Sequence, residues 1–203
     1  MSNFATEHPC DATGKTEKKM KMELTTERLV LRPWCESDAA DLYAFAQDGR
    51  VGPVAGWPVH KSVDESREVI RTVFAQEGVF AVTLKAEGRA IGCAGLLTGT
   101  KSNFPIGDDE GEISYWIGVP YWGQGLIPEA VRELICYGFE ELGLKALWCG
   151  YFDGNEKSWR VQEKCGFRPH HTTGAQYYAL TDDVRIEHVS CLTREEWKGM
   201  RQA

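Results

Sequence analysis

The chain lacks the features of a nucleic-acid binder and of a membrane protein. Basic residues are in deficit, because 23 Lys and Arg stand against 30 Asp and Glu, which gives a formal net charge of −7. A nucleic-acid-binding domain needs a basic surface, so nucleic acid is not expected as a partner. No apolar run has the length of a membrane span, and the N-terminus lacks the apolar core of a signal peptide. We therefore expect a cytoplasmic protein with no membrane partner.

Paired cysteines are also missing. The seven cysteines are scattered, form no Cys-x-x-Cys pair and have no histidine at metal-ligand spacing. Neither a zinc site nor a disulfide framework is expected from this pattern, and the sequence predicts no metal. Most of the cysteines fall in apolar runs, where a thiol behaves as a small hydrophobe and fits a reducing compartment.

The familiar phosphate-binding signatures are incomplete. Gly123 and Gly125 lack the third glycine and the downstream acid of a dinucleotide fingerprint, and Leu126 stands where a Walker loop needs lysine. Neither NAD nor ATP is indicated. The two glycines do lie between an expected strand at 112–119 and an expected amphipathic helix at 127–142. Backbone N–H groups and the dipole at such a helix start can hold a phosphate, although a plain turn explains the glycines equally well.

The remaining pattern predicts one α/β domain at 26–198, preceded by a polar tail at 1–22 that carries no chemistry. Strands alternate with helices in the middle, and hairpins flank both ends. This order is typical of a mixed sheet of about seven strands with helices on both faces. Strands are expected at 28–32, 79–84, 90–97, 112–119, 146–152, 167–171 and 184–192, and helices at 38–47, after Ser62, at 127–142, at 155–165 and at 193–200.

Two motifs in the second half of the chain carry a family resemblance. The first is Trp122-Gly123-Gln124-Gly125, and the second begins at Asn155-Glu156-Lys157-Ser158 and ends at Glu163-Lys164-Cys165-Gly166-Phe167. In this order and spacing they resemble the GNAT superfamily of N-acetyltransferases. The branch that they resemble most is named for ribosomal-protein alanine acetyltransferases. The similarity extends from about residue 26 to about residue 198.

This resemblance implies acetyl-CoA as the acetyl donor and a sheet that splays at its centre. The strand end would hydrogen-bond the pantetheine arm through Ile117, Gly118 and Val119. The N–H groups of the turn would hold the pyrophosphate, and Asn155 and Ser158 would contact the cofactor from the next helix. The superfamily often has Gln or Arg where this chain has Pro120, which has no donor. The turn residues whose N–H groups would hold the pyrophosphate are Gly123, Gln124, Gly125 and Leu126.

The catalytic groups are less clearly marked. Glu112, early in the central strand, is the candidate base, and Ser158 is the acid that the resemblance suggests. Many superfamily members have a tyrosine acid where this chain has Gln162, and His170 and His171 are reserve bases. Three further residues are expected to line the acceptor site: Trp57 and His60 in the loop between the first two helices, and Trp116.

The chemistry favours an α-amino group as acceptor. Such a group, with a pKa near about 8, is easier to deprotonate at neutral pH than a lysine amine near about 10.4. The leading prediction is therefore acetylation of a protein or peptide α-amino group. A small amine or antibiotic, or a non-catalytic acyl-CoA sensor, remains as an alternative. The pattern is compatible with a monomer or a homodimer.

Overall fold

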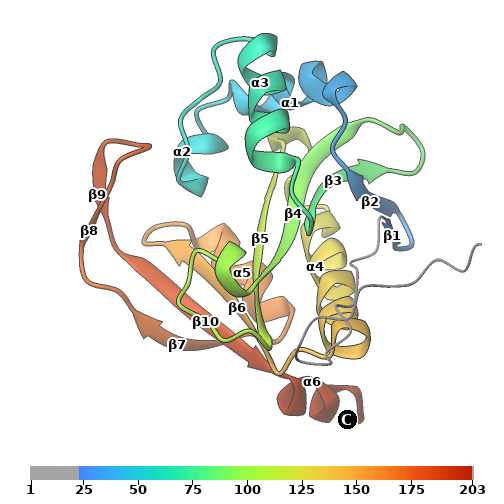
Figure 1. The fold of residues 1–203 in the computed structure, drawn as a ribbon, viewed down its shortest axis with the longest axis vertical. Coiled ribbons are helices and arrows are strands. Elements are labelled where there is room, and N and C mark those ends of the chain that lie inside the picture. The colour runs from blue at the N-terminus through green and yellow to red at the C-terminus, as the bar shows by residue number, and fades with distance from the viewer. Residues whose placement is uncertain (1–22, 203) are drawn as a thin grey trace, which may run out of the picture.

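The computed structural model describes residues 23–202, so the tail predicted at 1–22 lies outside the described part. An eight-stranded sheet forms its centre, in the order β1-β2-β3-β4-β5-β6-β10-β7, and a separate hairpin joins β8 to β9 (Figure 1). The strands are β1 Leu24–Thr25, β2 Leu29–Pro33, β3 Val79–Leu84, β4 Ala90–Thr98, β5 Glu110–Ile117, β6 Ala146–Phe152, β7 Arg168–Thr172, β8 Gln176–Tyr178, β9 Asp183–Arg185 and β10 Glu187–Thr193.

Six α-helices accompany the strands in residues 23–202. They are α1 Ala39–Ala46, α2 Gly52–Ala55, α3 Val63–Val69, α4 Leu126–Cys136, α5 Glu156–Lys164 and α6 Arg194–Gln202. Two of them continue as π-helical segments, α3 through Ile70–Phe74 and α4 through Tyr137–Leu142. The second segment ends at Gly143, whose φ of +78° is the left-handed conformation that commonly ends a helix. Within this described region no helix has the length and apolar composition needed to cross a membrane.

Helices cover both faces of the sheet, as predicted. On one face, α4 buries Ile127, Val131 and Leu134 in the larger core cluster, together with inward side chains of the central strands. On the other face, α1 contributes Leu42 and Ala46 to a second cluster. The two clusters explain why β4 reads as a continuous apolar run, because its residues are buried on both sides.

Strand pairing is antiparallel everywhere in the large sheet except between β5 and β6. A parallel pair needs a crossover connection, and α4 supplies it. This β5–α4–β6 unit places the glycine turn at the end of β5 and at the start of α4.

The structure corrects four details of the expected pattern. The large sheet has eight strands rather than about seven, because the short β1 was missed. The central strand spans Glu110–Ile117 rather than 112–119, since a 3-10 turn containing Pro120 begins at Val119. The strand expected at 184–192 is divided, and its first part pairs with β8 in a hairpin that was not predicted. Residues 52–55 of the expected loop form the short helix α2.

Candidate active site

The centre of the site is a gap between β5 and β6. The two strands pair from Glu110 to Glu112 on β5 and from Ala146 to Trp148 on β6. Beyond this point β5 continues to Ile117, still paired with β4, while β6 continues to Phe152, paired with β10. The β6-facing edge of β5 is therefore left to other partners, and an extended ligand can lie against it as an added strand.

The glycine turn lies beside the end of this gap. Gly123 and Gly125 both have a φ of +75°, a left-handed conformation that glycine adopts without steric cost. Gly125 is the N-cap of α4 and Leu126 is its first residue. The first N–H groups of a helix have no acceptor within the helix, and the helix dipole adds positive potential. A Cβ on Gly123 would meet no atom within 4 Å, so the turn has open space in front of it.

Two cationic side chains flank this turn, and the sequence analysis assigned neither to the site. Arg28 donates from Nη1 to the carbonyl of Gln124 over 3.0 Å and forms an ion pair with Glu129 at 2.7 Å. The Nζ atom of Lys157 lies 3.5 Å from the ring centre of Trp122. A diphosphate at the turn would meet both positive charges in addition to the helix start. Arg28 comes close to the turn because β2 lies next to α4, which requires knowledge of the tertiary fold.

The predicted pantetheine-binding residues stand at the end of β5, with some backbone groups already engaged. The N–H of Gly118 donates to the carbonyl of Ile91 over 2.9 Å. The carbonyl of Ile117 accepts from the indole Nε1 of Trp122 over 3.0 Å. Because peptide groups alternate in direction along a strand, the N–H of Ile117 points away from β4 and toward the gap. Cofactor contacts of Ile117, Gly118 and Val119 stay predictions.

Asn155 caps α5. Its Oδ1 accepts from the backbone N–H of Ser158 over 3.3 Å, which satisfies one of the free donors of the helix start. Its Nδ2 lies 3.4 Å from the carbonyl of Val54. Asn155 therefore has a capping role in the structure, while a contact between Asn155 and a cofactor stays a prediction.

The hydroxyl of Ser158 belongs to a partly buried polar network. The Tyr115 hydroxyl lies 3.0 Å from Ser158 Oγ, and Gln162 Nε2 lies 3.4 Å from it. Gln162 is fully buried, donates to the carbonyl of Gly150 over 3.1 Å and accepts from Ser190 Oγ over 2.5 Å. Burial raises the pKa of Tyr115 well above its usual range, so its phenol stays protonated. The network thus links β5, β6, β10 and α5 around the gap.

The residues predicted to line the acceptor site lie together. The Trp57 ring centre is 5.4 Å from that of His60 and 5.7 Å from that of Trp116. His60 is buried, its Nδ1 lies 2.8 Å from Ser66 Oγ, and burial lowers its pKa. Among residues 23–202 the buried indole N–H of Trp116 has no hydrogen-bond partner, which is uncommon for a buried donor.

Glu112 is buried, at 5% exposure, rather than solvated. Its Oε2 accepts from Ser102 Oγ over 2.8 Å and from the Asn103 backbone N–H over 2.5 Å, and its Oε1 accepts from Asn103 Nδ2 over 3.0 Å. The carboxylate therefore fastens the turn that precedes β5. Its catalytic role stays a prediction.

A second carboxylate, Glu187, lies in this region and was not predicted from the sequence. Glu187 begins β10 and pairs with Phe152 of β6. Burial raises its pKa, and its Oε2 accepts from the Tyr178 hydroxyl over 3.1 Å. A Cβ on Gly150 would lie 2.3 Å from Glu187 Oε1, so the carboxylate rests directly over the β6 backbone. We predicted a single strand at 184–192. Glu187 would be an ordinary residue of that strand, so the sequence offered no reason to expect a functional role.

Buried thiols line the same region without the properties of a nucleophile. Burial raises the pKa of Cys149 strongly and that of Cys165 to about 11. A thiol in that state carries almost no thiolate near neutral pH, and the thiolate is the reactive form. These side chains favour direct transfer over an acetylated cysteine.

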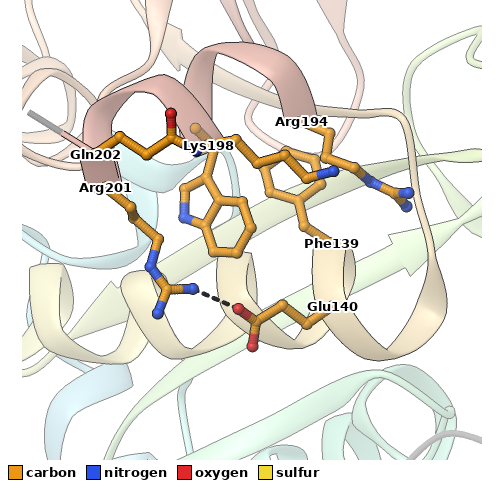
Figure 2. A pocket seen from close by; sticks show the side chains of 7 residues that line it. Phe139, Glu140, Arg194, Lys198, Arg201 and Gln202 are labelled. Atoms are coloured by element: carbon orange, nitrogen blue, oxygen red, sulfur yellow. Dashed lines mark hydrogen bonds and ion pairs between the residues drawn. The ribbon is translucent and has the colours of Figure 1, made fainter.

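A separate hollow lies away from this site (Figure 2). It has a volume of about 400 Å³ and lies between α6 and the π-helical end of α4, where Arg201 pairs with Glu140. Phe139 of this hollow is 13 residues beyond Leu126, which corresponds to about 20 Å along a helix. It is therefore distant from the glycine turn. A smaller hollow of about 190 Å³ includes the reserve bases His170 and His171, both exposed on β7.

A splayed β5–β6 pair beside a glycine turn that opens a helix is the architecture of an acyl-CoA-dependent N-acetyltransferase. Comparison with known proteins agrees, because residues 28–168 match the family model described as "Acetyltransferase (GNAT) domain". The chain belongs to the GNAT acetyltransferase family. Members of this family use acetyl-CoA as co-substrate and act on amine-bearing acceptors.

Individual relatives include proteins with ribosomal names. The chain is 39% identical over 88 residues to "Putative ribosomal N-acetyltransferase YdaF" of Bacillus subtilis, a match that covers 43% of this chain and about half, 48%, of the relative. The crystal structure of a GNAT-family acetyltransferase from Bacillus anthracis superposes with a TM-score of 0.74 at 21% identity, covering 86% of this chain and 99% of that one. The ribosomal-protein-S5-alanine acetyltransferase from Vibrio fischeri gives a TM-score of 0.65 at 20% identity, covering 87% and 99%.

Proposed function

We propose that the protein transfers an acetyl group from acetyl-CoA to a primary amine, with a protein or peptide α-amino group as the leading acceptor. The observation that carries this proposal is the gap between β5 and β6, which ends beside the left-handed turn at Gly123 and Gly125. The cysteines among residues 23–202 are free thiols, which suits a reducing compartment, and we expect the protein to act in the cytoplasm.

The donor set fits coenzyme A. The N–H groups of residues 123–126 would hold the pyrophosphate, with Arg28 and Lys157 adding positive charge. Ile117, Gly118 and Val119 would pair with the amide groups of the pantetheine arm, in the manner of a strand added to an open edge. Asn155 and Ser158 would meet the same arm from the start of α5.

The reaction that follows needs little covalent help from the protein. Acetyl-CoA supplies an activated thioester. The neutral amine forms a bond to the carbonyl carbon, the carbon–sulfur bond breaks, and its electron pair leaves with sulfur. A carboxylate takes the proton that the ammonium must lose before attack. The candidates are Glu112 and Glu187, on the sheet face that carries Trp116, which we call the acceptor face. The Ser158 hydroxyl, which lies 3.0 Å from the Tyr115 hydroxyl, would protonate the departing thiolate.

The acceptor assignment rests on the ease of deprotonation and on the relatives. An α-amino group has a pKa near about 8, so deprotonating it at neutral pH costs only about 1 kcal/mol. Two of the compared proteins carry ribosomal names, which supports a protein amino terminus. The exposed rim of the aromatic cluster can admit a chain end, since Trp57 and Trp116 are only partly buried.

Turnover with a panel of acceptors tests the proposal. Purified protein is mixed with acetyl-CoA and short peptides beginning with alanine or serine, the same peptides with a blocked amino terminus, lysine, and small aminoglycosides. Thiol release and mass spectrometry should locate the acetyl group on the free amino terminus. Acetylation of the small amines alone would show that the acceptor is a small amine and not a protein or peptide amino terminus. Coenzyme A binding by calorimetry without any turnover would indicate a sensor, and no binding at millimolar levels would remove the proposal.

A further inference from the structure

Two carboxylates share the acceptor face of the sheet. Glu112 lies opposite Trp148, and Glu187 lies opposite Phe152. Cross-strand partners point to the same side, and side chains along a strand alternate with a period of two. Because Trp148 and Phe152 are four residues apart on β6, both carboxylates project from one face. It is the face of Trp116, four residues beyond Glu112 on β5.

The two carboxylates differ in what already surrounds them. Both oxygens of Glu112 accept hydrogen bonds from the Ser102–Asn103 turn, three in all. Removing the Glu112 carboxylate would free the Ser102–Asn103 turn. The contacts of Glu112 therefore support the local structure.

Glu187 has a single hydrogen bond to its side chain among residues 23–202, from the Tyr178 hydroxyl to Oε2. Its Oε1 rests over Gly150, two residues beyond the last β6 residue that pairs with β5. A side chain at position 150 would displace the carboxylate, because a Cβ there would lie 2.3 Å from Oε1 and 2.8 Å from the Phe104 ring. The glycine thus leaves one carboxylate oxygen at the edge of the gap.

The opposite side of β6 carries the proposed acid. The carbonyl of Gly150 is bonded to Gln162, which also reaches the Ser158 hydroxyl. Glu187 therefore lies over Gly150 from one side of β6. Ser158 is linked to the Gly150 carbonyl through Gln162 from the other side. A thioester in the gap would have a proton acceptor on one side and a proton donor on the other.

From this geometry we propose that Glu187 is the proton acceptor of the transfer reaction and that Glu112 is a positioning residue that fixes the Ser102–Asn103 turn. The assignment rests on the proposed function. One proton passes from the acceptor ammonium to Glu187, directly or through a water molecule, and then to solvent. After the carbon–nitrogen bond forms, the nitrogen loses its second proton and the departing thiolate gains one, so one proton is released per turnover.

The groups around Glu187 make the assignment testable through pH. Burial raises the pKa of Glu187, the hydrogen bond from Tyr178 lowers it, and the charge of Glu112 raises it. Cys149 of β6 is protonated, because burial raises its pKa. The Arg185 guanidinium lies 4.8 Å from the Phe152 ring centre and is paired with Asp183. Tyr178 and Glu112 therefore influence Glu187 in opposite directions.

The experiment measures kcat/KM against pH with acetyl-CoA and a hexapeptide beginning with alanine. The wild-type profile should fall on its acid side as the base becomes protonated. Glu187→Gln should lower kcat/KM about 100-fold and remove this acid limb, in line with the usual contribution of a general base. Tyr178→Phe should move the limb to higher pH and Glu112→Gln should move it to lower pH. Glu195→Gln, an exposed carboxylate of α6, is the matched control and should behave as wild type.

Melting temperature and coenzyme A affinity are recorded for every variant, so a loss of folding is recognised. If Glu187→Gln does not fold, the shift in Tyr178→Phe still decides the matter, and an unmoved limb there overturns the assignment. Glu187→Gln with kcat/KM within threefold of wild type would also overturn it, as would loss of the limb in Glu112→Gln alone. A wild type that binds no coenzyme A, or acetylates no amine, refutes the proposed function itself and the role of Glu187 with it.

Discussion

The Tyr115 phenol and the Ser158 hydroxyl lie 3.0 Å apart and join the central strand to α5 across the core of the site. Tyr115 is partly buried and burial raises its pKa, so it remains a hydrogen-bond donor throughout the pH range of interest. It can donate to Ser158 Oγ, which leaves the serine proton free for a third group, or to the Ser158 carbonyl, which is also 3.0 Å away. The first arrangement makes Ser158 a proton donor with a fixed orientation.

Replacement of this pair should reveal whether it acts as a unit. Ser158→Ala is expected to lower kcat about tenfold with the KM for acetyl-CoA unchanged. This is less than the usual effect of proton transfer, since a thiolate with a pKa of about 8.5 leaves readily. Tyr115→Phe should lower kcat in the same way and cost about 1 kcal/mol of stability for the lost hydrogen bond. The double variant should be no slower than Ser158→Ala, and additive effects would argue against a shared role.

Local signals in the sequence were sufficient for much of the fold. The apolar runs at 79–84 and 146–152 coincide with β3 and β6, and the helix expected at 127–142 matches α4 with its π-helical extension. Gly125 and Gly143 mark the two ends of this helix, and both take a left-handed conformation. These features depend on neighbours within a few residues, so the sequence alone is informative.

The site depended more on contacts between distant segments. The sequence pointed to Glu112 as a candidate. Its contacts with Ser102 and Asn103 could not be predicted, because they depend on how the preceding loop folds. Glu187 was overlooked, since its burial depends on Tyr178 of a hairpin whose short, exposed strands give a weak periodic signal. Arg28 was read only as the start of a strand. In each case the decisive partner is at least nine residues away in sequence.

Arg28 provides a test of charge at the glycine turn. Its side chain is 44% exposed, and its guanidinium is held between the Gln124 carbonyl and Glu129. Arg28→Gln should weaken coenzyme A binding about tenfold and reduce its salt dependence, because one charge near the diphosphate is lost. Stability should change by less than about 1 kcal/mol, as for other exposed ion pairs.

Glu129→Gln is the matched control for Arg28. It breaks the same ion pair but removes a negative charge from the site, so coenzyme A affinity should stay the same or rise. Calorimetry at low and high salt measures both variants. Equal weakening in the two would indicate that the ion pair holds the turn in shape and that Arg28 adds no direct attraction.

His60 makes a prediction about stability and pH. Burial lowers its pKa in the folded protein below the ordinary value of about 6.5. Between the two values the unfolded chain binds more protons, so stability falls as the pH is lowered through this window. The melting temperature should therefore drop more between about pH 7.5 and about pH 5.5 in wild type than in His60→Gln, a range chosen to bracket that value of about 6.5. Differential scanning calorimetry can measure this, and parallel curves would show that His60 charges equally well when folded.

Gly125 allows strain and charge to be separated at the proposed pyrophosphate site. Any side chain there meets the steric cost of a φ of +75°, about 1–2 kcal/mol. A Cβ at this position has room, since its nearest neighbour is Arg28 Nη2 at 3.7 Å. Gly125→Gln and Gly125→Glu therefore impose the same strain and nearly the same volume, and only the second adds a negative charge to the start of α4.

Coenzyme A affinity should fall in both Gly125 variants, and by at least a further tenfold in Gly125→Glu. That extra loss corresponds to about 1.4 kcal/mol of repulsion between the carboxylate and the diphosphate. Raising the salt concentration should narrow the difference between the two variants, because screening weakens the repulsion. Equal affinities at low salt would mean that the diphosphate binds away from this turn, and the cofactor contacts assigned to residues 123–126 would then have to be moved.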